Sequence, residues 1–197
     1  MAKLYFYYGT MFSAKSAKLL IMIHNFRERG RSPLVLTSSL DDRFGSTGEI
    51  HSRIPGLSCK AHPVSSGNGT ETDIVSLFSE GRYDVVMADE VQFFSPSQVD
   101  QLAQIVDKYD VNVFAFGLRT SFKHELFPST ARLMAAADTI REIKTMCECG
   151  RKATVNALLD DTGAVLTEGA DIQIGSSEYA ALCRRCWKKR TAGYGAV

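Results

Sequence analysis

The sequence predicts an α/β fold, in which a parallel sheet carries helices on both faces and a small zinc-bound subdomain lies beside it. Short apolar runs alternate with helical patterns over residues 1–140, which is typical of parallel strands joined by helices. Short strands, turns and two close cysteine pairs then replace this alternation. We expect a first domain over residues 1–143, a zinc-binding subdomain over 144–192 and a flexible tail over 193–197.

The composition argues against several kinds of protein. The chain has 197 residues, 45% of them hydrophobic, which is enough for a substantial core. Its formal net charge of +1 gives no general attraction to nucleic acid or to membranes. No signal peptide or membrane-spanning apolar run is evident, so we expect a cytoplasmic protein. The basic stretch at 183–190 is interpreted as solvated charge around a metal site.

The first strand and the first helix enclose a short loop. Residues 4–8 form an apolar and aromatic run that Gly9 ends. A helical pattern begins at Ser16, and Gly30 is the expected stop. The apolar face of this helix consists of Leu19, Leu20, Ile23 and Phe26.

Three further strands and one clear helix start follow. Residues 34–36 and 85–87 read as buried strands, and 111–116 as another strand closed by a glycine. Residues 38–56 are polar and glycine-rich, which indicates loops with a short hairpin. Residues 95–98 read Ser-Pro-Ser-Gln, the pattern of a capped helix N-terminus with proline at its first position.

The loop after the first strand has the pattern of a phosphate-binding loop. Such loops read Gly, four residues, then Gly-Lys-Ser/Thr, and their backbone N–H groups converge on phosphate oxygens at a helix N-terminus. Lys15 would bring charge to the transferred phosphoryl group, and the Ser16 hydroxyl would bind Mg²⁺. Ala14 replaces the usual glycine, and its methyl group is tolerated if the backbone there is right-handed. The expected ATP-binding segment is Gly9, Thr10, Met11, Phe12, Ser13, Ala14, Lys15 and Ser16.

Two carboxylates end the apolar strand at residues 85–87. Asp89 is suited to hold Mg²⁺, directly or through water, as P-loop nucleotidases require at the end of a neighbouring strand. Glu90 can accept the proton of an attacking hydroxyl group. Either residue alone is also typical of an ordinary strand end. Together with the phosphate-loop pattern, the pair predicts a nucleotide-using enzyme.

Four of the five cysteines form two close pairs, Cys147 with Cys149 and Cys183 with Cys186. In a reducing compartment such pairs indicate metal ligation rather than disulfides, and four thiolates suit a tetrahedral zinc ion. Ordinary thiols are the alternative. Because four sulfurs fill the coordination shell, we expect the zinc to be structural.

Four motifs together resemble the type II thymidine kinases: GTMFSAKS, DEVQFF, FGLRTSFKHELFP and IGSSEYAALCRRC. The resemblance covers nearly the whole chain and implies a P-loop, RecA-like kinase domain with a zinc-held lasso subdomain. It implies transfer of the γ-phosphoryl group of ATP to the 5′-hydroxyl of thymidine, and also of deoxyuridine, in pyrimidine salvage. It further implies a homotetramer inhibited by thymidine triphosphate. Glycine is usual in this family at the position of Ala14.

The resemblance also implies roles for single residues. Lys15 and Glu90 would be catalytic, with Glu90 as general base, while Ser16 and Asp89 would bind magnesium. Three further residues would complete the ATP site, namely Asp42, Arg43 and Gln92. The residues implied for substrate binding are Met11, Phe93, Leu118, Phe122, Phe127, Asp171, Ile172, Gln173, Ile174, Gly175 and Tyr179.

Two other functions compete with this one. The first is a P-loop ATPase whose cysteine knuckle binds nucleic acid, and the second is a pseudo-enzyme whose Ala14 prevents nucleotide binding. Several residues are given no role in the chemistry. We expect core positions for Phe114 and Phe116 and surface positions for His51 and His124, while Arg53 is interpreted as a solvated or subunit-contact arginine.

Overall fold

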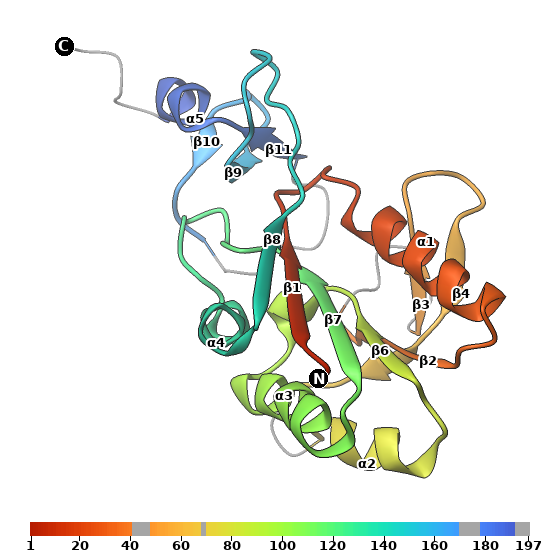
Figure 1. Ribbon diagram of the computed structural model, residues 1–197. Helices are drawn as coiled ribbons and strands as arrows, with labels where there is room; N and C mark the ends of the chain where they lie inside the picture. Colours follow the sequence, from red (N-terminus) through yellow and green to blue (C-terminus); the bar gives the residue numbers. More distant parts are fainter. Residues whose placement is uncertain (41–47, 68–69, 170–177, 192–197) are drawn as a thin grey trace.

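The computed structural model describes residues 1–40, 48–67, 70–169 and 178–191, and it contains the predicted parallel sheet (Figure 1). All strand pairs of this six-stranded sheet are parallel, in the order β5-β2-β6-β7-β1-β8. The sequence analysis did not predict the two edge strands. The strands are β1 (Leu4–Tyr8), β2 (Pro33–Ser38), β5 (His62–Val64), β6 (Val85–Ala88), β7 (Asn112–Gly117) and β8 (Thr139–Glu142).

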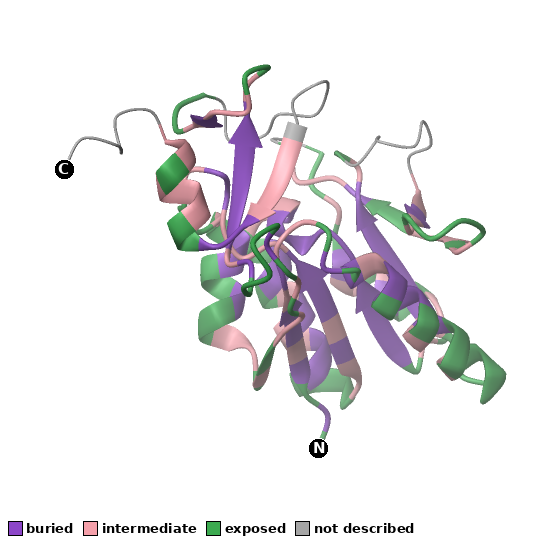
Figure 2. Ribbon diagram, turned by 90° about the horizontal axis from the view of Figure 1, so that it is seen from above, coloured by how far each residue is buried: buried purple, intermediate pink, exposed green. Residues whose placement is uncertain are grey.

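Helices cover both faces of the sheet, as predicted. On one face lies α1 (Lys15–Glu28), and on the other lie α2 (Ile74–Glu80), α3 (Pro96–Tyr109) and α4 (Pro128–Ala136) (Figure 1). The side chains of β6 alternate between the two faces. Val85 and Met87 pack in the core with α1, whereas Val86 and Ala88 pack in the core with the other helices. The strands are therefore buried between two helical layers (Figure 2).

The ends of α1 and α3 follow from their sequences. Gly30 has a φ of 68°, and its N–H donates to the carbonyl of Arg27 while the N–H of Arg31 donates to Phe26, the pattern of a Schellman motif. At the start of α3, the Ser95 hydroxyl accepts from the N–H of Gln98, and the Gln98 side chain accepts from the N–H of Ser95. The predicted capping box is confirmed.

The expected core aromatic residues lie on β7. Phe116 is fully buried and stacks on Tyr7 at 4.7 Å between ring centroids. Phe114 is half-buried, stacks on Tyr5 and packs against the same core cluster. These rings pack between the sheet and α1. Neither phenylalanine ring lines the cavity of Lys15 and Glu90 that is described in the next subsection.

Two smaller sheets accompany the main one. A short hairpin was expected within residues 38–56. The observed hairpin pairs β3 (Glu49–His51) with β4 (Ser58–Lys60), so its second strand lies beyond that range. Beyond β8, the antiparallel order β10-β9-β11 forms a separate sheet with its own core. Its elements are β9 (Val155–Leu159), β10 (Val165–Leu166), β11 (Glu178–Leu182) and α5 (Arg184–Arg190). Within the described part of the chain, no helix is long and apolar enough to span a membrane.

Candidate active site

The phosphate-binding loop lies between β1 and α1, as the sequence predicts. A Cβ atom at Gly9 would lie 2.4 Å from the Ser13 hydroxyl oxygen and 2.5 Å from the carbonyl oxygen of Ile143, so only glycine fits there. The hydroxyl groups of Thr10 and Ser13 are buried, and no residue of the described segments hydrogen-bonds to them. Buried hydroxyls normally have partners, so these two are suited to phosphate oxygens.

Lys15 reaches across this loop. Its side chain is 8% exposed, and its Nζ atom donates to the carbonyl oxygens of Gly9 at 3.3 Å and of Thr10 at 3.0 Å. A buried ammonium group requires such partners because desolvation penalises its charge. Lys15 is therefore held over the loop, where phosphate oxygens would meet it.

Ala14 departs from the sequence-based expectation. Its methyl group was expected to be tolerated in a right-handed backbone, but Ala14 has φ 59° and ψ 33°, which is left-handed. A non-glycine residue in this conformation costs roughly 1–2 kcal/mol, because Cβ crowds the following carbonyl. Ala14 is nevertheless exposed and lines the cavity described below, so its methyl group is not packed into the core. Alanine at this position therefore strains the backbone of the loop without adding bulk to the core.

Asp89 and Glu90 follow β6 at the same end of the sheet as the loop. Asp89 is only 2% exposed, and it accepts hydrogen bonds from the Ser16 hydroxyl and from the N–H of Glu90. Burial, and then the neighbouring Glu90 carboxylate, raise the pKa of Asp89 to about 7. Ser16 and Lys15 oppose that shift. A cation beside Asp89 would favour the ionised form, as expected of a magnesium ligand.

Gln92 holds the side chain of Glu90. Its Nε2 atom donates to Glu90 Oε2 at 2.5 Å, and its Oε1 atom accepts from the N–H of Leu118 at 2.9 Å. A Cβ atom at Gly117 would lie 2.7 Å from that Oε1 atom, so glycine at the end of β7 makes room for the amide. Gln92, which was predicted to bind ATP, thus positions the carboxylate.

Most of the predicted phosphate-site residues share one cavity of about 470 Å³ with Glu90 and Leu118. The loop residues from Met11 to Ser16 line it. Residues 51–54, at the end of β3 and just after it, also line it, although the sequence analysis expected His51 at the surface. The guanidinium carbon of Arg53 lies 4.0 Å from the centroid of the Phe12 ring. No local pattern distinguishes Arg53 from a solvated arginine, because its place depends on the hairpin reaching α1.

The other residues implied for thymidine binding are arranged less uniformly. The rings of Phe93 and Phe127 meet edge to face, 6.1 Å between centroids. Phe122 is only 1% exposed, and Tyr179 is half-buried on β11. None of these four is among the described residues that line the cavity of Lys15 and Glu90. Asp42, Arg43 and Asp171, Ile172, Gln173, Ile174 and Gly175 lie outside the described residues.

Asn156 connects the two parts of the molecule, and the sequence analysis missed it. This buried side chain on β9 accepts from the N–H of Met11 at 2.8 Å and donates to the carbonyl of Thr120 at 2.8 Å. It thereby joins the phosphate-binding loop to the segment after β7. A single asparagine in a strand carries no recognisable motif, so the sequence held no signal for this role.

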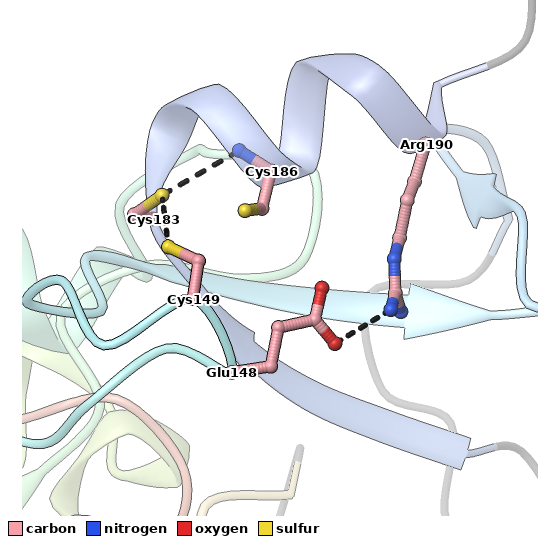
Figure 3. A network of polar contacts seen from close by, with 5 residues as sticks. All are labelled: Glu148, Cys149, Cys183, Cys186 and Arg190. Carbon is pink, nitrogen blue, oxygen red and sulfur yellow. Dashed lines mark hydrogen bonds and ion pairs between the residues drawn. The ribbon is translucent and has the colours of Figure 1, made fainter.

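The four paired cysteines converge, as predicted. One sulfur from each of Cys147, Cys149, Cys183 and Cys186 lies within 4.8 Å of all the others. Figure 3 shows Cys149 approaching Cys183, with 3.7 Å between their sulfur atoms, and Cys186 one helical turn further along. Beside them, an ion pair of 2.6 Å joins Glu148 to Arg190. A tetrahedral zinc site with Zn–S bonds of about 2.3 Å has sulfurs about 3.8 Å apart, so the cluster fits zinc.

The acidity of these thiols also suits a cation. The N–H of Cys186 donates to Cys183 and, with neighbouring thiols, lowers the pKa of Cys183 to about 7. Hydrogen bonding to the neighbouring thiols, chiefly Cys149, raises the pKa of Cys186 to about 12. Four thiolates this close repel one another, so full ionisation needs a bound metal ion.

A phosphate-binding loop facing an acidic pair, on a parallel sheet covered by helices, defines a P-loop nucleotide-binding protein with a cysteine metal site. Comparison with known proteins narrows this class. The family model described as thymidine kinase matches residues 2–187. The chain therefore belongs to the thymidine kinase family.

Individual thymidine kinases are similar in sequence to this chain over nearly their whole length. A thymidine kinase of Ruegeria pomeroyi is 46% identical over 197 residues, covering 100% of this chain and 98% of that protein. One from Agrobacterium fabrum is 44% identical and covers 95% and 96% respectively. A crystal structure of Bacteroides Pif1 bound to single-stranded DNA matches 72% of this chain and 38% of that one at 16% identity. Its TM-score of 0.38 is too low to support any inference.

Asp89→Asn should stabilise the nucleotide- and metal-free protein at pH 8 but not at pH 4. With its folded pKa near 7 and an unfolded value near 3.8, Asp89 ionises more readily in the unfolded chain. Stability is therefore lost as the pH rises from about 4 to 7, and the neutral amide avoids this loss. We expect a gain above about 1 kcal/mol at pH 8, measured by urea unfolding.

Asp84→Asn is the matched control, because the pKa of Asp84 is shifted in the opposite direction to that of Asp89. The N–H of Ser32 lowers the pKa of the exposed Asp84, so its ionised form favours the folded state. The amide should reduce stability at pH 8. An equal effect of Asp89→Asn at pH 4 and pH 8 would show that the shift of its pKa is absent.

Cys183→Ser should release the zinc, whereas Cys59→Ser should not. Cys183 is buried at the centre of the cluster, and Cys59 lies on β4, outside it. We expect about one zinc per chain in the native protein and in the Cys59 variant, measured by elemental analysis. A native protein that folds without metal, or equal loss of zinc from both variants, would contradict a structural zinc site.

Proposed function

We propose that this protein transfers the γ-phosphoryl group of ATP to the 5′-hydroxyl group of thymidine. Membership of the thymidine kinase family supports the activity. The structural observation that supports the site is the cavity shared by Lys15 and Glu90, with Ser16 hydrogen-bonded to Asp89 beside it. This arrangement allows a nucleoside alcohol to be aligned with a phosphorus atom held by the loop.

In this proposal Glu90 is the general base. A ribose hydroxyl is a poor nucleophile at neutral pH, so the Glu90 carboxylate accepts its proton as the oxygen attacks the γ-phosphorus. The bond from that phosphorus to the β,γ-bridging oxygen breaks, and ADP leaves with the electron pair. Gln92 keeps Glu90 in place through the 2.5 Å hydrogen bond to its carboxylate. Leu118 fixes Gln92 in turn.

Most of the rate enhancement then comes from positioning and from neutralising charge. The ammonium group of Lys15 exchanges its bonds with the loop carbonyls for phosphate oxygens. The buried hydroxyl groups of Thr10 and Ser13 supply further donors. Ser16 and Asp89 would hold Mg²⁺, which supplies positive charge to the triphosphate when bound.

The base of thymidine is proposed to lie near Met11 and Leu118, which line the cavity, and near the edge-to-face pair of Phe93 and Phe127. Flat apolar side chains suit a pyrimidine ring with its methyl group. The family resemblance adds Phe122, Tyr179 and residues 171–175 to this pocket. A backbone segment can discriminate between bases because an unpaired buried amide costs about 1–3 kcal/mol.

Several wider properties belong to the same proposal. Deoxyuridine would be a second substrate, and the protein would act in pyrimidine salvage in the cytoplasm. It would form a homotetramer inhibited by thymidine triphosphate. The four cysteines would hold structural zinc, which keeps the subdomain of β9, β10 and β11 in shape. Asn156 of this subdomain accepts a hydrogen bond from the N–H of Met11, so the order of the subdomain would also help to position the phosphate-binding loop.

The direct test supplies the purified protein with Mg-ATP and each natural deoxynucleoside. We expect thymidine monophosphate as the product. Glu90→Gln should lower turnover by roughly 10²- to 10⁴-fold while ATP binding persists, because only proton transfer is lost. Product formation is measured by chromatography, and ATP binding by calorimetry.

Glu80→Gln is the control for this substitution, because Glu80 is exposed at the end of α2, far from the cavity. It should leave turnover unchanged. Preferred use of a purine nucleoside would refute the proposed substrate. Full activity of Glu90→Gln would refute the proposed base. ATP hydrolysis stimulated by DNA, without nucleoside phosphorylation, would instead favour the nucleic-acid-binding ATPase.

The left-handed Ala14 is the one observation that favours the pseudo-enzyme. We expect instead that Ala14→Gly leaves the dissociation constant for ATP within about threefold, since alanine already adopts the loop geometry. Glycine should raise the free energy of unfolding by up to about 1 kcal/mol, because it relieves the strain.

Ala17→Gly provides the contrast, since Ala17 is buried within α1 and glycine there should cost about 1 kcal/mol. Both variants are measured by urea unfolding and by calorimetry with ATP. ATP binding that appears only in Ala14→Gly would establish the pseudo-enzyme.

A further inference from the structure

A second cavity, of about 750 Å³, lies on the side of the molecule that carries the cysteine cluster. Three segments that are far apart in the sequence meet around it: the one after β7, the one before β9, and the start of α5. We call it the basic cavity because its ionisable lining residues are cationic or histidine, apart from Cys183 of the cysteine cluster. The cationic residues and the histidine are Arg119, His124, Arg151, Lys152, Arg184 and Arg185.

Carboxylates compensate little of the positive charge of this cavity. Four thiolates around one Zn²⁺ would carry a net charge of about −2, which is less than the charge of the five cationic side chains in the lining. Lys152 forms an ion pair with Glu142, with 2.7 Å between Nζ and Oε2. Among the described residues, no carboxylate lies within ion-pair distance of the four arginines, and none lines the cavity. Gathering like charges in one concave surface costs free energy, which a bound anion recovers.

The pKa of His124 is affected by two of these arginines. Its ring packs on Trp187 of α5, 4.3 Å between centroids. Burial first, and then the charges of Arg119 and Arg184, lower the pKa of His124. The guanidinium groups of two different segments therefore act on one point of the cavity wall.

We propose that the basic cavity binds a small anion with several phosphate groups, at a site separate from the cavity of Lys15 and Glu90. Planar guanidinium groups bind phosphate oxygens in pairs, and several of them together favour a multiply charged ligand. An extended nucleic acid is less suitable, because the chain has a formal net charge of only +1 and the neighbouring cations Lys152 and Arg190 are already paired with Glu142 and Glu148.

The basic cavity adjoins the link between the two parts of the molecule. Thr120 lines the cavity, and its carbonyl accepts from Asn156, which also accepts from the N–H of Met11. An anion bound there would thus contact the segment that carries Leu118. The proposal does not depend on the proposed kinase reaction, since it concerns binding at residues outside that cavity.

The test titrates the full-length protein with inorganic tripolyphosphate by calorimetry at 0.15 M salt. Two classes of site are expected in the native protein, one at the phosphate-binding loop and one at the basic cavity. Lys15→Met should retain only the second. Adding Arg151→Gln and Arg185→Gln to that variant should weaken the remaining binding by at least about tenfold. The matched control adds Arg29→Gln and Arg82→Gln, both exposed elsewhere, and should leave it unchanged.

Zinc content and thymidine phosphorylation are measured on Arg151→Gln/Arg185→Gln in an otherwise native chain, which shows that it folds. In that chain the number of tripolyphosphate sites should fall from two to one. The proposal is overturned if Lys15→Met binds no tripolyphosphate or if the cavity and control substitutions weaken binding equally. It is also overturned if a single-stranded oligonucleotide binds the basic cavity more tightly than tripolyphosphate does. If the native protein does not phosphorylate thymidine, that result counts against the proposed function and not against anion binding in the basic cavity.

Discussion

The meeting of Ser16 with Asp89 is the contact on which the site depends. The two residues come from opposite sides of β7, one at the start of α1 after β1 and the other after β6. In a parallel sheet the carboxyl ends of all strands lie along one edge, so the topology brings a loop and an acidic pair together although they are far apart in the chain. Burial of Asp89 beside Glu90 makes that place unfavourable for two negative charges and favourable for a cation.

The cysteine cluster acts at a distance from this chemistry. The small sheet of β9, β10 and β11 has its own apolar core, too small to be stable without further support. Four cysteines that could hold one metal ion lie beside that core, and Asn156 of β9 accepts a hydrogen bond from the N–H of Met11. A metal ion bound at the cluster would thus support a loop that it does not touch.

Elements defined by local chemistry could be predicted from the sequence. The Ser95 capping box, the glycine that ends α1 and the cysteine spacing each depend on residues a few positions apart. Features that depend on tertiary contacts could not. The strand β8 has two exposed residues among four and lies at an edge, so its sequence lacks an apolar run. The left-handed backbone at Ala14 was missed because alanine normally indicates the opposite conformation.

The hairpin of β3 and β4 is a lengthy excursion between β2 and β5, two strands that are neighbours in the main sheet. Its turn carries Arg53 to the Phe12 ring, at the rim of the nucleotide cavity. Since both ends of the excursion are anchored in the sheet, insertions or deletions at its tip would deepen or shorten one wall while the strand register stays as it is.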